Sequence, residues 1–570
     1  MVVGIDLGTT NSAIGIWRDG RAQLIPNSLG SVLTPSAVSV DDGGEFVIGL
    51  AARERQITHP TLTATSFKRF MGSNRSILLG VRHTLRPEEL SAMVLRSLKA
   101  DAEVFLGEPV VEAVITVPAY FNDKQRKATR RAGELAGFKV ERLLNEPTAA
   151  ALAYGIHELN NDTRFLVFDL GGGTFDVSVL DIFDGVIEVR SSTGDNRLGG
   201  DDFNQVLVDD FFAVLRETFG NRRQIADPVL TERVREQAER ARRLLSTQDS
   251  AVMSVVWLDR EVKHEVTTER FESLCVTLME RLREPVVRAL RDSKISAETL
   301  REIILVGGAT RMPVVRRAVT RMFGRFPSAG PNPDEAIAIG AAVQAGLKAR
   351  DAALKDVVMT DVCPYTLGVD TGEQRADGSL QEGIFAPIIE RNTVVPASRE
   401  KRFATLQDNQ REVVFNVYQG ESRRVADNVH LGVIGLAVPP RPRGAVTIDV
   451  RFTYDINGLL EVDVKSPETG ETRQLVVLDA EVDMTSGEMK RRRDELAALK
   501  IHPRDTALNR AALARAARCY EQFVGEERTQ IGRLTSHFEG ALDRQDPREI
   551  EIAREEFMNA LDEIDGERYL

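Results

Sequence analysis

The stretch FDLGGGTFD, residues Phe168–Asp176, repeats part of GIDLGTTNS, residues Gly4–Ser12, because both contain Asp-Leu-Gly. An apolar run and then an Asp-Gly pair follow each stretch, at Asp19-Gly20 and at Asp184-Gly185. Asp-Gly between two apolar runs is a strong signal for a β-hairpin. We therefore expect the same strand and hairpin arrangement in both parts of the chain.

The landmarks that follow also recur in the same order: a buried apolar strand, a helix, and a helix rich in small residues. Because alanine and glycine let two helices cross closely, we expect the last helices of the two halves to meet at a hinge. This predicts two copies of a β-β-β-α-β-α lobe, with both Asp-Leu-Gly loops in the cleft between them. The strands are expected at Ala113–Pro118 and Glu302–Gly308, and the helices at Asp123–Gly137, Asn145–Gly155, Pro313–Phe323 and Asn332–Gly346.

The two Asp-Leu-Gly loops have the composition of a phosphate site. Glycines let the backbone wrap around phosphate groups, and the hydroxyls of Thr9, Thr10 and Thr174 can add donors. Asp6 and Asp169 would repel phosphate unless Mg²⁺ lies between them. Either loop alone is better explained as an ordinary turn, and the duplicated lobe favours a Mg·ATP site.

A predicted helix at Val234–Ser246 places Glu239, Arg242, Arg243 and Ser246 on one face. That face could bind a ribose through the glutamate and serine and stack on a base through an arginine. A solvated charged face is the alternative for this segment taken alone.

Composition restricts the class of protein. The 570 residues are 42% hydrophobic and 28% charged, with a net charge of −12, which argues against general nucleic-acid binding. Cys275, Cys363 and Cys519 are far apart and form no CxxC pair, so buried reduced thiols are expected. The start MVVGIDLGTT does not resemble a signal peptide, and no run of 18 apolar residues predicts a membrane span. We expect a cytoplasmic protein.

Six stretches, in order along the chain, resemble the ATPase motifs of the heat-shock-70 chaperone family of the DnaK type. They are GIDLGTTNS, VITVPAYFND, NEPTAAALAYG, FDLGGGTFDVS, LVGGATRMP and NPDEAIAIGAAVQAG. The wording DVCPYTLGVD is most similar to the HscC branch. The resemblance implies an α/β actin-like (ribonuclease-H-like) two-lobed ATPase at 1–355 and an interdomain linker at 356–361. An antiparallel β sandwich would follow at 362–480 and a helical lid at 481–570.

The resemblance also implies ATP/ADP and Mg²⁺ as ligands, with K⁺ as a further candidate ion. The positions matching the family's catalytic set are Lys68, Glu146, Thr174 and Asp176, and Asp6 and Asp169 match its Mg²⁺ carboxylates. The positions matching its nucleotide contacts are Gly8, Thr9, Thr10, Asn11, Gly171, Gly172, Gly173, Thr174, Gly199, Gly200, Glu239, Arg242, Arg243, Ser246, Gly307, Gly308, Arg311 and Asp334.

Two of these positions have an ordinary structural explanation, and a third differs from the residue that is usual in the family. Lys68, expected to orient the attacking water, would otherwise be a solvated surface lysine. Glu146, expected to assist hydrolysis, would otherwise be a first-turn acid that favours the helix dipole. At Arg242 the family usually has lysine, and arginine keeps the charge and can stack on a purine.

The residue pattern changes in the last third of the chain. The apolar junction Asp356–Pro364 resembles the family's linker, although its Val-Val-Met-Thr is less apolar than the usual leucines. A period of two around Val446–Tyr454 predicts strands. In the family this sandwich binds extended apolar peptides. The matching positions are Val369, Phe403, Leu406, Val413, Phe415 and Leu459, although ordinary core is the better explanation for any one of them taken alone. Gly372 leaves an arch position without a side chain, and Phe557, Leu561 and Ile564 form a helical apolar stripe.

The resemblance implies a J-domain co-chaperone as partner, through Arg142, Asn145 and Asp361. We expect unfolded apolar peptides as substrates. We also expect the protein to be a monomer. A shortened segment between KRFMGS and LGEPV weakens the expectation of a nucleotide-exchange factor. Two alternatives stay open: a sugar or acetate kinase built on the same lobes, and a binding protein that uses ATP structurally.

Overall fold

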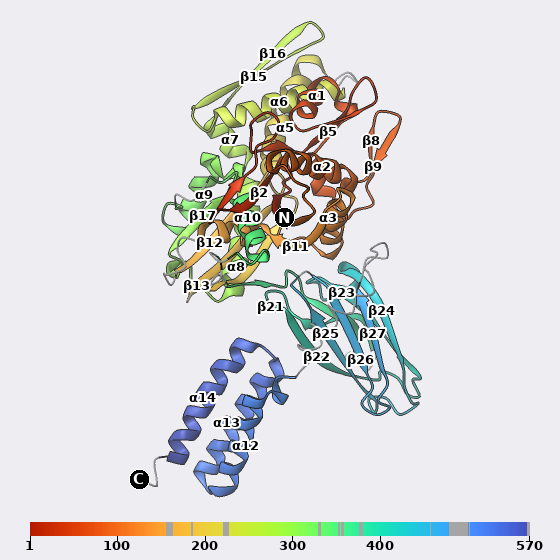
Figure 1. Ribbon diagram of the computed structural model, residues 1–570, viewed down its shortest axis with the longest axis vertical. Helices are drawn as coiled ribbons and strands as arrows, with labels where there is room; N and C mark the ends of the chain where they lie inside the picture. The colour runs from red at the N-terminus through yellow and green to blue at the C-terminus, as the bar shows by residue number, and fades with distance from the viewer. Residues whose placement is uncertain are drawn as a thin grey trace. The chain divides into compact units, whose positions relative to one another are not determined.

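The computed structural model forms two compact units, Met1–Pro364 and Tyr365–Leu570, and each is described by itself (Figure 1). The described residues are 1–155, 163–183, 186–220, 227–328, 332–351, 354, 358–374, 380–456, 458–477, 500 and 502–566. The hairpin pair Asp184-Gly185, Val357 of the linker and the start of the predicted lid lie outside them.

The first lobe is built on a mixed sheet in the order β11-β10-β1-β2-β3. β1 pairs in parallel with β10 and antiparallel with β2, and Arg18 faces Arg21 across the predicted Asp19-Gly20 hairpin. The strands are β1 (Val2–Asp6), β2 (Asn11–Arg18), β3 (Arg21–Leu24), β10 (Glu112–Val117) and β11 (Lys139–Asn145).

The second lobe repeats this sheet in the order β17-β12-β13-β14, with β18 added at the edge. β12 pairs in parallel with β17 and antiparallel with β13, as β1 does with β10 and β2. The duplicated lobe predicted from Asp-Leu-Gly is thus confirmed. The strands are β12 (Thr163–Leu170), β13 (Phe175–Phe183), β14 (Val186–Asp195), β17 (Glu302–Val306) and β18 (Val358–Val362).

The two small-residue helices cross closely, as expected. α4 (Glu146–Gly155) packs on β12 and β13 of the second sheet, whereas α10 (Ala336–Lys348) packs on β1 and β2 of the first. At their crossing, a Cβ on Gly340 would lie 1.7 Å from the carbonyl oxygen of Ala149. Only glycine allows this approach, so the two lobes exchange their last helices around one tight contact.

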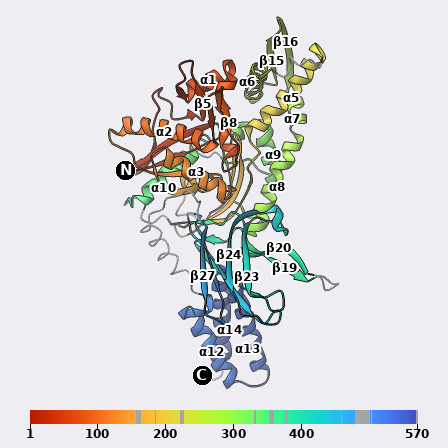
Figure 2. The same cartoon turned by 90° about the vertical axis from the view of Figure 1, so that its right-hand side faces the viewer.

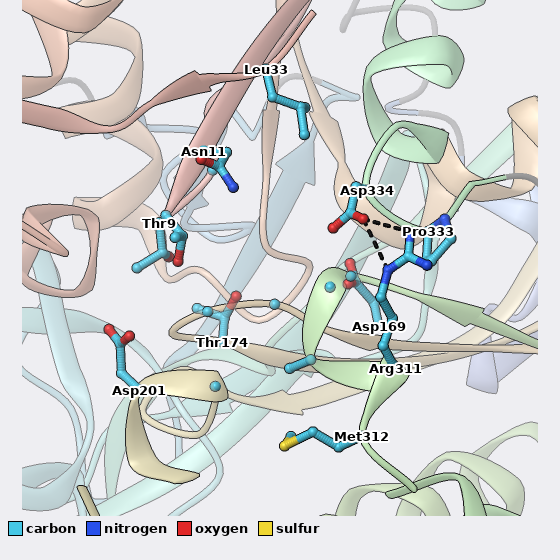
Figure 3. A pocket seen from close by; sticks show the side chains of 18 of the residues that line it. Thr9, Asn11, Leu33, Asp169, Thr174, Asp201, Arg311, Met312, Pro333 and Asp334 are labelled. Atoms are coloured by element: carbon cyan, nitrogen blue, oxygen red, sulfur yellow. Dashed lines mark hydrogen bonds and ion pairs between the residues drawn. The ribbon is translucent and has the colours of Figure 1, made fainter. Parts of the chain in front are cut away.

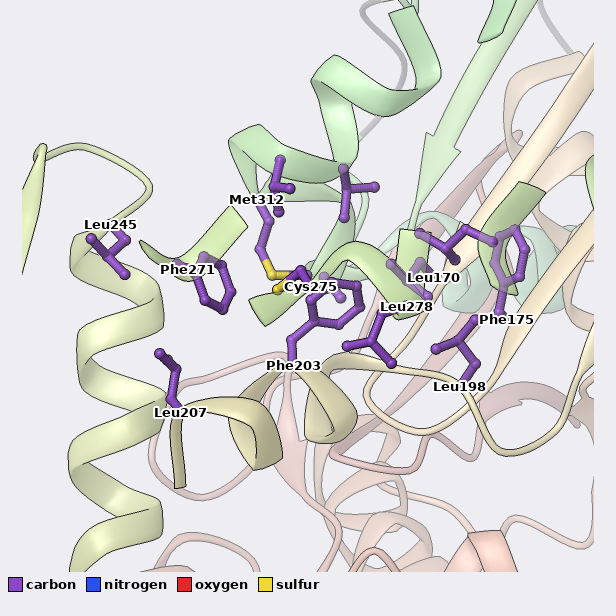
Figure 4. Packing of buried hydrophobic residues seen from close by; sticks show 14 of the residues in the cluster. Leu170, Phe175, Leu198, Phe203, Leu207, Leu245, Phe271, Cys275, Leu278 and Met312 are labelled. Atoms are coloured by element: carbon purple, nitrogen blue, oxygen red, sulfur yellow. The ribbon is translucent and has the colours of Figure 1, made fainter. Parts of the chain in front are cut away.

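Helices and small sheets complete each lobe. In the second lobe, the side chains of Phe203, Cys275 and Met312 meet in one buried apolar cluster (Figure 4). The first lobe adds α1 (Leu50–Thr58), η2 (Phe67–Phe70), α2 (Pro87–Leu106) and α3 (Asp123–Leu135). The second adds α5 (Gly200–Phe219), α6 (Pro228–Leu244), α7 (Thr268–Leu274), α8 (Val276–Ser293), η5 (Gly308–Arg311), α9 (Pro313–Phe323) and the hairpin β15 (Ser250–Trp257) and β16 (Arg260–Thr267).

The second unit contains the predicted antiparallel sandwich. Its sheets have the orders β20-β19-β23-β24 and β22-β25-β26-β27. Ile448, Val450 and Phe452 are buried at alternate positions, as the period of two predicts. The strands are β19 (Leu367–Gln374), β20 (Leu380–Ile389), β22 (Ala397–Ala404), β23 (Glu412–Gln419), β24 (Val429–Ala437), β25 (Thr447–Tyr454), β26 (Leu460–Lys465) and β27 (Thr472–Val477).

Three helices end the described chain: α12 (Ala507–Gln522), α13 (Glu526–Arg544) and α14 (Pro547–Gly566) (Figure 2). Phe557 and Leu561 are buried between them, and Phe557 stacks on Phe538 with ring centroids 4.8 Å apart, which confirms the apolar stripe. No described helix is long and apolar enough to cross a membrane. All three cysteines are buried, and none of them forms a disulfide bond.

Candidate functional site

A cavity of about 540 Å³ lies in the first unit, where the Asp-Leu-Gly loops of both lobes meet (Figure 3). The structure brings most of the predicted nucleotide residues together in its walls. These are Asp6, Gly8, Thr9, Thr10, Asn11, Lys68, Glu146, Asp169, Gly171, Gly172, Thr174, Gly200, Glu239, Arg242, Arg243, Ser246, Gly307, Gly308, Arg311 and Asp334.

Three predicted residues do not line the cavity and lie directly behind it. A Cβ on Gly199 would lie 2.4 Å from the backbone nitrogen of Gly173, so these two glycines let α5 begin against the loop. Asp176 faces Asp169 across the β12–β13 pair, is buried, and accepts a 3.2 Å hydrogen bond from the Tyr120 backbone N–H.

The two loops touch at Gly172. A Cβ there would lie 1.9 Å from the hydroxyl oxygen of Thr10 in the opposite loop. Because only glycine permits this approach, backbone N–H groups and hydroxyls from both lobes can surround one small anion. The arrangement suits the phosphate groups of a nucleotide.

Three aspartates lie at or behind these loops, and Asp6 and Asp169 line the cavity. Burial first, and then the Glu146 carboxylate, raise the pKa of Asp6 to about 7 and that of Asp176 to about 8. The same two causes, in that order, raise the pKa of Asp169 well above its usual value, and its buried Oδ2 has no hydrogen-bond partner among the described residues. The described residues hold no group of three or more metal-ligating side chains, so Asp6 and Asp169 fit a cation such as Mg²⁺, which keeps several waters and needs few carboxylates.

The pKa shifts predict how stability depends on pH. The folded protein keeps the Asp176 proton up to pH about 8, whereas an unfolded aspartate loses it near pH 4. The contribution of Asp176 to the free energy of unfolding without nucleotide should therefore fall from about pH 4 to about pH 8, by about 1.4 kcal/mol per pH unit. Urea titrations should show this fall, and Asp176→Asn should reduce it. Asp19→Asn, at an exposed site, should leave it unchanged, and an unaltered pH profile in Asp176→Asn would contradict the assignment.

Lys68 and Glu146 form a buried ion pair beside the phosphate loops. The Lys68 Nζ lies 2.6 Å from Glu146 Oε1, and their side chains are 3% and 7% exposed. η2 supplies the lysine and the first turn of α4 supplies the glutamate. The lysine is therefore not a solvated surface charge, and the pair can orient a water molecule and accept its proton.

Arg242, Arg243 and Arg311 also line the cavity. Arg311 donates a 2.7 Å hydrogen bond from its Nη2 to Asp334 (Figure 3), and another of 2.7 Å to Asn332. Burial lowers the pKa of Arg242, whereas nearby Glu239 favours its charged form. These side chains can stack on a purine and bind sugar hydroxyls.

Four polar contacts join the two lobes above the cavity. In each, a residue between 53 and 69 of the first lobe donates to a carboxylate of α5 or α6. The pairs are Arg53–Glu239 at 2.9 Å, Gln56–Glu232 at 2.9 Å, Ser66–Asp201 at 2.7 Å and Arg69–Asp202 at 2.6 Å. These contacts link the first lobe to α5 and α6.

Some cavity residues were not predicted. Asp201 follows the predicted Gly200 directly, and Met312 ends the motif LVGGATRMP, so their neighbours could have indicated them. No sequence signal identifies Leu33. The cavity residues outside the prediction are Leu33, Asp201, Asn204, Ala309, Met312, Pro333 and Ile337.

The end of the first unit carries the predicted linker residues. β18 pairs in parallel with β14, and the buried Asp361 carboxylate accepts two 2.8 Å hydrogen bonds from the Asn145 side chain. The Arg142 guanidinium bonds Gln344 at 3.1 Å and favours the charged form of Asp361, whose pKa burial raises. Arg142, Asn145 and Asp361 are thus brought together.

Some of the predicted peptide-binding positions are buried in the sandwich, and the others are half-buried. Val369, Val413 and Phe415 are buried, and the Phe415 ring lies 5.3 Å from that of half-buried Phe403. Leu406 and Leu459 are also half-buried.

The neighbouring side chains explain why a glycine stands at position 372. A Cβ there would lie 2.8 Å from Leu380 Cδ1 and 3.2 Å from Leu406 Cδ1. Leucine side chains therefore fill the space that a larger residue would need.

Comparison with known proteins adds independent findings. A family model described as Hsp70 protein matches residues 2–79 and 74–568. A curated relative, Chaperone protein DnaK of Thermotoga neapolitana, is 44% identical over 490 residues. The aligned region covers 84% of this chain and 80% of the relative.

Proposed function

The chain belongs to the Hsp70 family, and from this premise we propose that its cavity binds Mg·ATP and that hydrolysis there controls peptide binding by the sandwich. The protein is an ATP-dependent chaperone with ATPase activity that assists protein folding. The kinase alternative loses its support, because the family match extends through the sandwich and the last helices.

The residues around the cavity have separate roles in this proposal. Mg²⁺ held by Asp6 and Asp169 would neutralise charge on the phosphates. Thr10 and Thr174 donate hydroxyls from opposite loops, and Lys68 orients the attacking water while Glu146 accepts its proton. The α6 face and Arg311 hold the nucleoside.

One observation carries the coupling between hydrolysis and peptide binding. The linker strand β18 lies on β14, and Asp361 is anchored by Asn145 within the first unit. Asn145 directly precedes Glu146, the proposed base. A change at the hydrolytic residues therefore reaches the linker anchor through one peptide bond, and the docked linker is the two-state element.

Removing the Asp361 anchor tests this coupling. We expect Asp361→Ala to lower the stimulation of ATP turnover by a J-domain protein and an unfolded peptide about tenfold, with basal turnover changed less than about threefold. Asn145→Ala should act alike, and the double variant should be no worse than either single one. Steady-state phosphate release measures this. Full stimulation of both variants would contradict the proposed anchor, and no stimulation of the unaltered protein would contradict the proposed coupling.

The finer assignments stay predictions of the sequence. They are a J-domain partner, extended apolar substrates, a K⁺ ion, weak dependence on an exchange factor, a monomeric state, a cytoplasmic location and membership of the HscC branch. The unusual linker and Gly372 support a search for substrates that differ from those of the relative. A peptide array probed with ATP and with ADP would identify them.

A further inference from the structure

Asn204 lies in the cavity wall one helical turn after Gly200, at the start of α5. Its side chain is nearly buried, with 7% of the residue exposed. α5 packs against α6, the helix that carries Arg242. A buried amide needs hydrogen-bond partners, so its contacts show what it does.

The Asn204 Oδ1 accepts a 2.7 Å hydrogen bond from the Nε of Arg242. This bond fixes the plane of the guanidinium, because the Nε–H direction is rigid within it. The two terminal amines of Arg242 stay available to a ligand. A lysine at this position would have only one nitrogen, and Asn204 would compete with the ligand for it.

The charge of Arg242 depends on its neighbour on α6. Burial disfavours the charged form of Arg242, and Glu239 counteracts this. Asn204 therefore contributes the acceptor that orients the guanidinium, and an amide oxygen or a carboxylate at position 204 can supply that acceptor.

Arg242 lines the cavity together with Glu239, Arg243 and Ser246, the residues proposed to bind the nucleoside. We propose that Asn204 is a positioning residue that orients Arg242 toward the sugar and base of the nucleotide. The inference rests on the proposed nucleotide site and deepens it.

Displacement of a fluorescent ADP analogue tests the proposal with two competitors, ADP and adenosine. Asn204→Leu should weaken the binding of both competitors by about tenfold, since it leaves the buried Nε of Arg242 without an acceptor. Asn204→Asp, which keeps an acceptor at the same place, should stay within about threefold of the unaltered protein. Gln205→Ala is the matched control, because Gln205 is exposed on the same helix and bonds only Asp209 among the described residues.

A double-mutant cycle separates positioning from a purely structural role. Arg242→Lys removes the Nε, so adding Asn204→Leu to it should cause little further loss of ADP affinity.

Three results would overturn the proposal: unchanged ADP affinity in Asn204→Leu, losses that multiply in the double variant, or an Asn204→Asp variant as weak as Asn204→Leu. If Asn204→Leu does not fold, the comparison of Asn204→Asp with the unaltered protein decides, and a tenfold loss there counts against it. If the unaltered protein binds neither ADP nor adenosine, the proposed nucleotide site is wrong instead.

Discussion

Lys68→Ala is expected to lower the rate of single-turnover ATP hydrolysis by about 10²–10⁴-fold. The Lys68 ammonium is buried and lies 2.6 Å from Glu146 Oε1, so its removal takes away the cation of this pair. ADP affinity should change less than about threefold, because the proposed contacts to the nucleoside come from α6 and Arg311. Phosphate release from preformed complexes and ADP titration measure the two quantities separately.

The control for Lys68→Ala has to take account of Glu146, the ion-pair partner of Lys68. Removing the lysine leaves Glu146 as a buried charge without its counter-ion, which costs about 3–5 kcal/mol if the carboxylate stays ionised. The neutral double variant Lys68→Met/Glu146→Gln should be more stable than Lys68→Ala and equally inactive. Equal hydrolysis rates in Lys68→Ala and the unaltered protein would favour the structural use of ATP.

Gly340→Val should lower the free energy of unfolding of the first unit by more than about 3 kcal/mol. A Cβ at this position would lie 1.7 Å from the Ala149 carbonyl oxygen, and backbone in two crossing helices cannot rotate away as a side chain can. The lobes would have to separate at the hinge, so nucleotide binding should fall as well. Thermal unfolding with and without ADP measures both effects.

A second glycine provides the comparison for Gly340. Gly540 lies in α13, and an added Cβ would meet only the Arg544 side chain at 3.6 Å, an ordinary contact. Gly540→Ala should be neutral or stabilise by up to about 1 kcal/mol, because alanine favours helix. A stable, nucleotide-binding Gly340→Val variant would show that the crossing can relax.

The duplicated lobe could be predicted because its signals are local. Asp-Leu-Gly, the hairpin at Asp19-Gly20 and the two small-residue helices each depend on neighbouring residues, and their order reveals the symmetry. The shared face of Glu239 and Arg242 follows from the helical period alone. These patterns predicted the two loops and the α6 face that line the cavity, whereas Lys68, Glu146, Arg311 and Asp334 came from the resemblance to the family.

Long-range pairings could not be predicted in the same way. Arg53 reaches Glu239 from a separate helix of the other lobe, and Asn204 meets Arg242 only because α5 packs on α6. Thr453 alternates with apolar residues in the period-two pattern, yet it is fully buried and bonds Ser398 at 3.1 Å. Such contacts depend on how distant elements meet, which residue patterns do not encode.

The exchange of hinge helices has a consequence for synthesis on the ribosome. Gly4 of β1 lies against Ala341 of α10, whereas Val3 and Ile5 face the core of their own lobe. The apolar face of the first sheet that carries Gly4 therefore stays uncovered during translation until residues 336–348 have emerged from the ribosome. The nascent chain of this chaperone carries, for most of its translation, the kind of exposed surface that chaperones bind, and its two lobes can complete their folding only together.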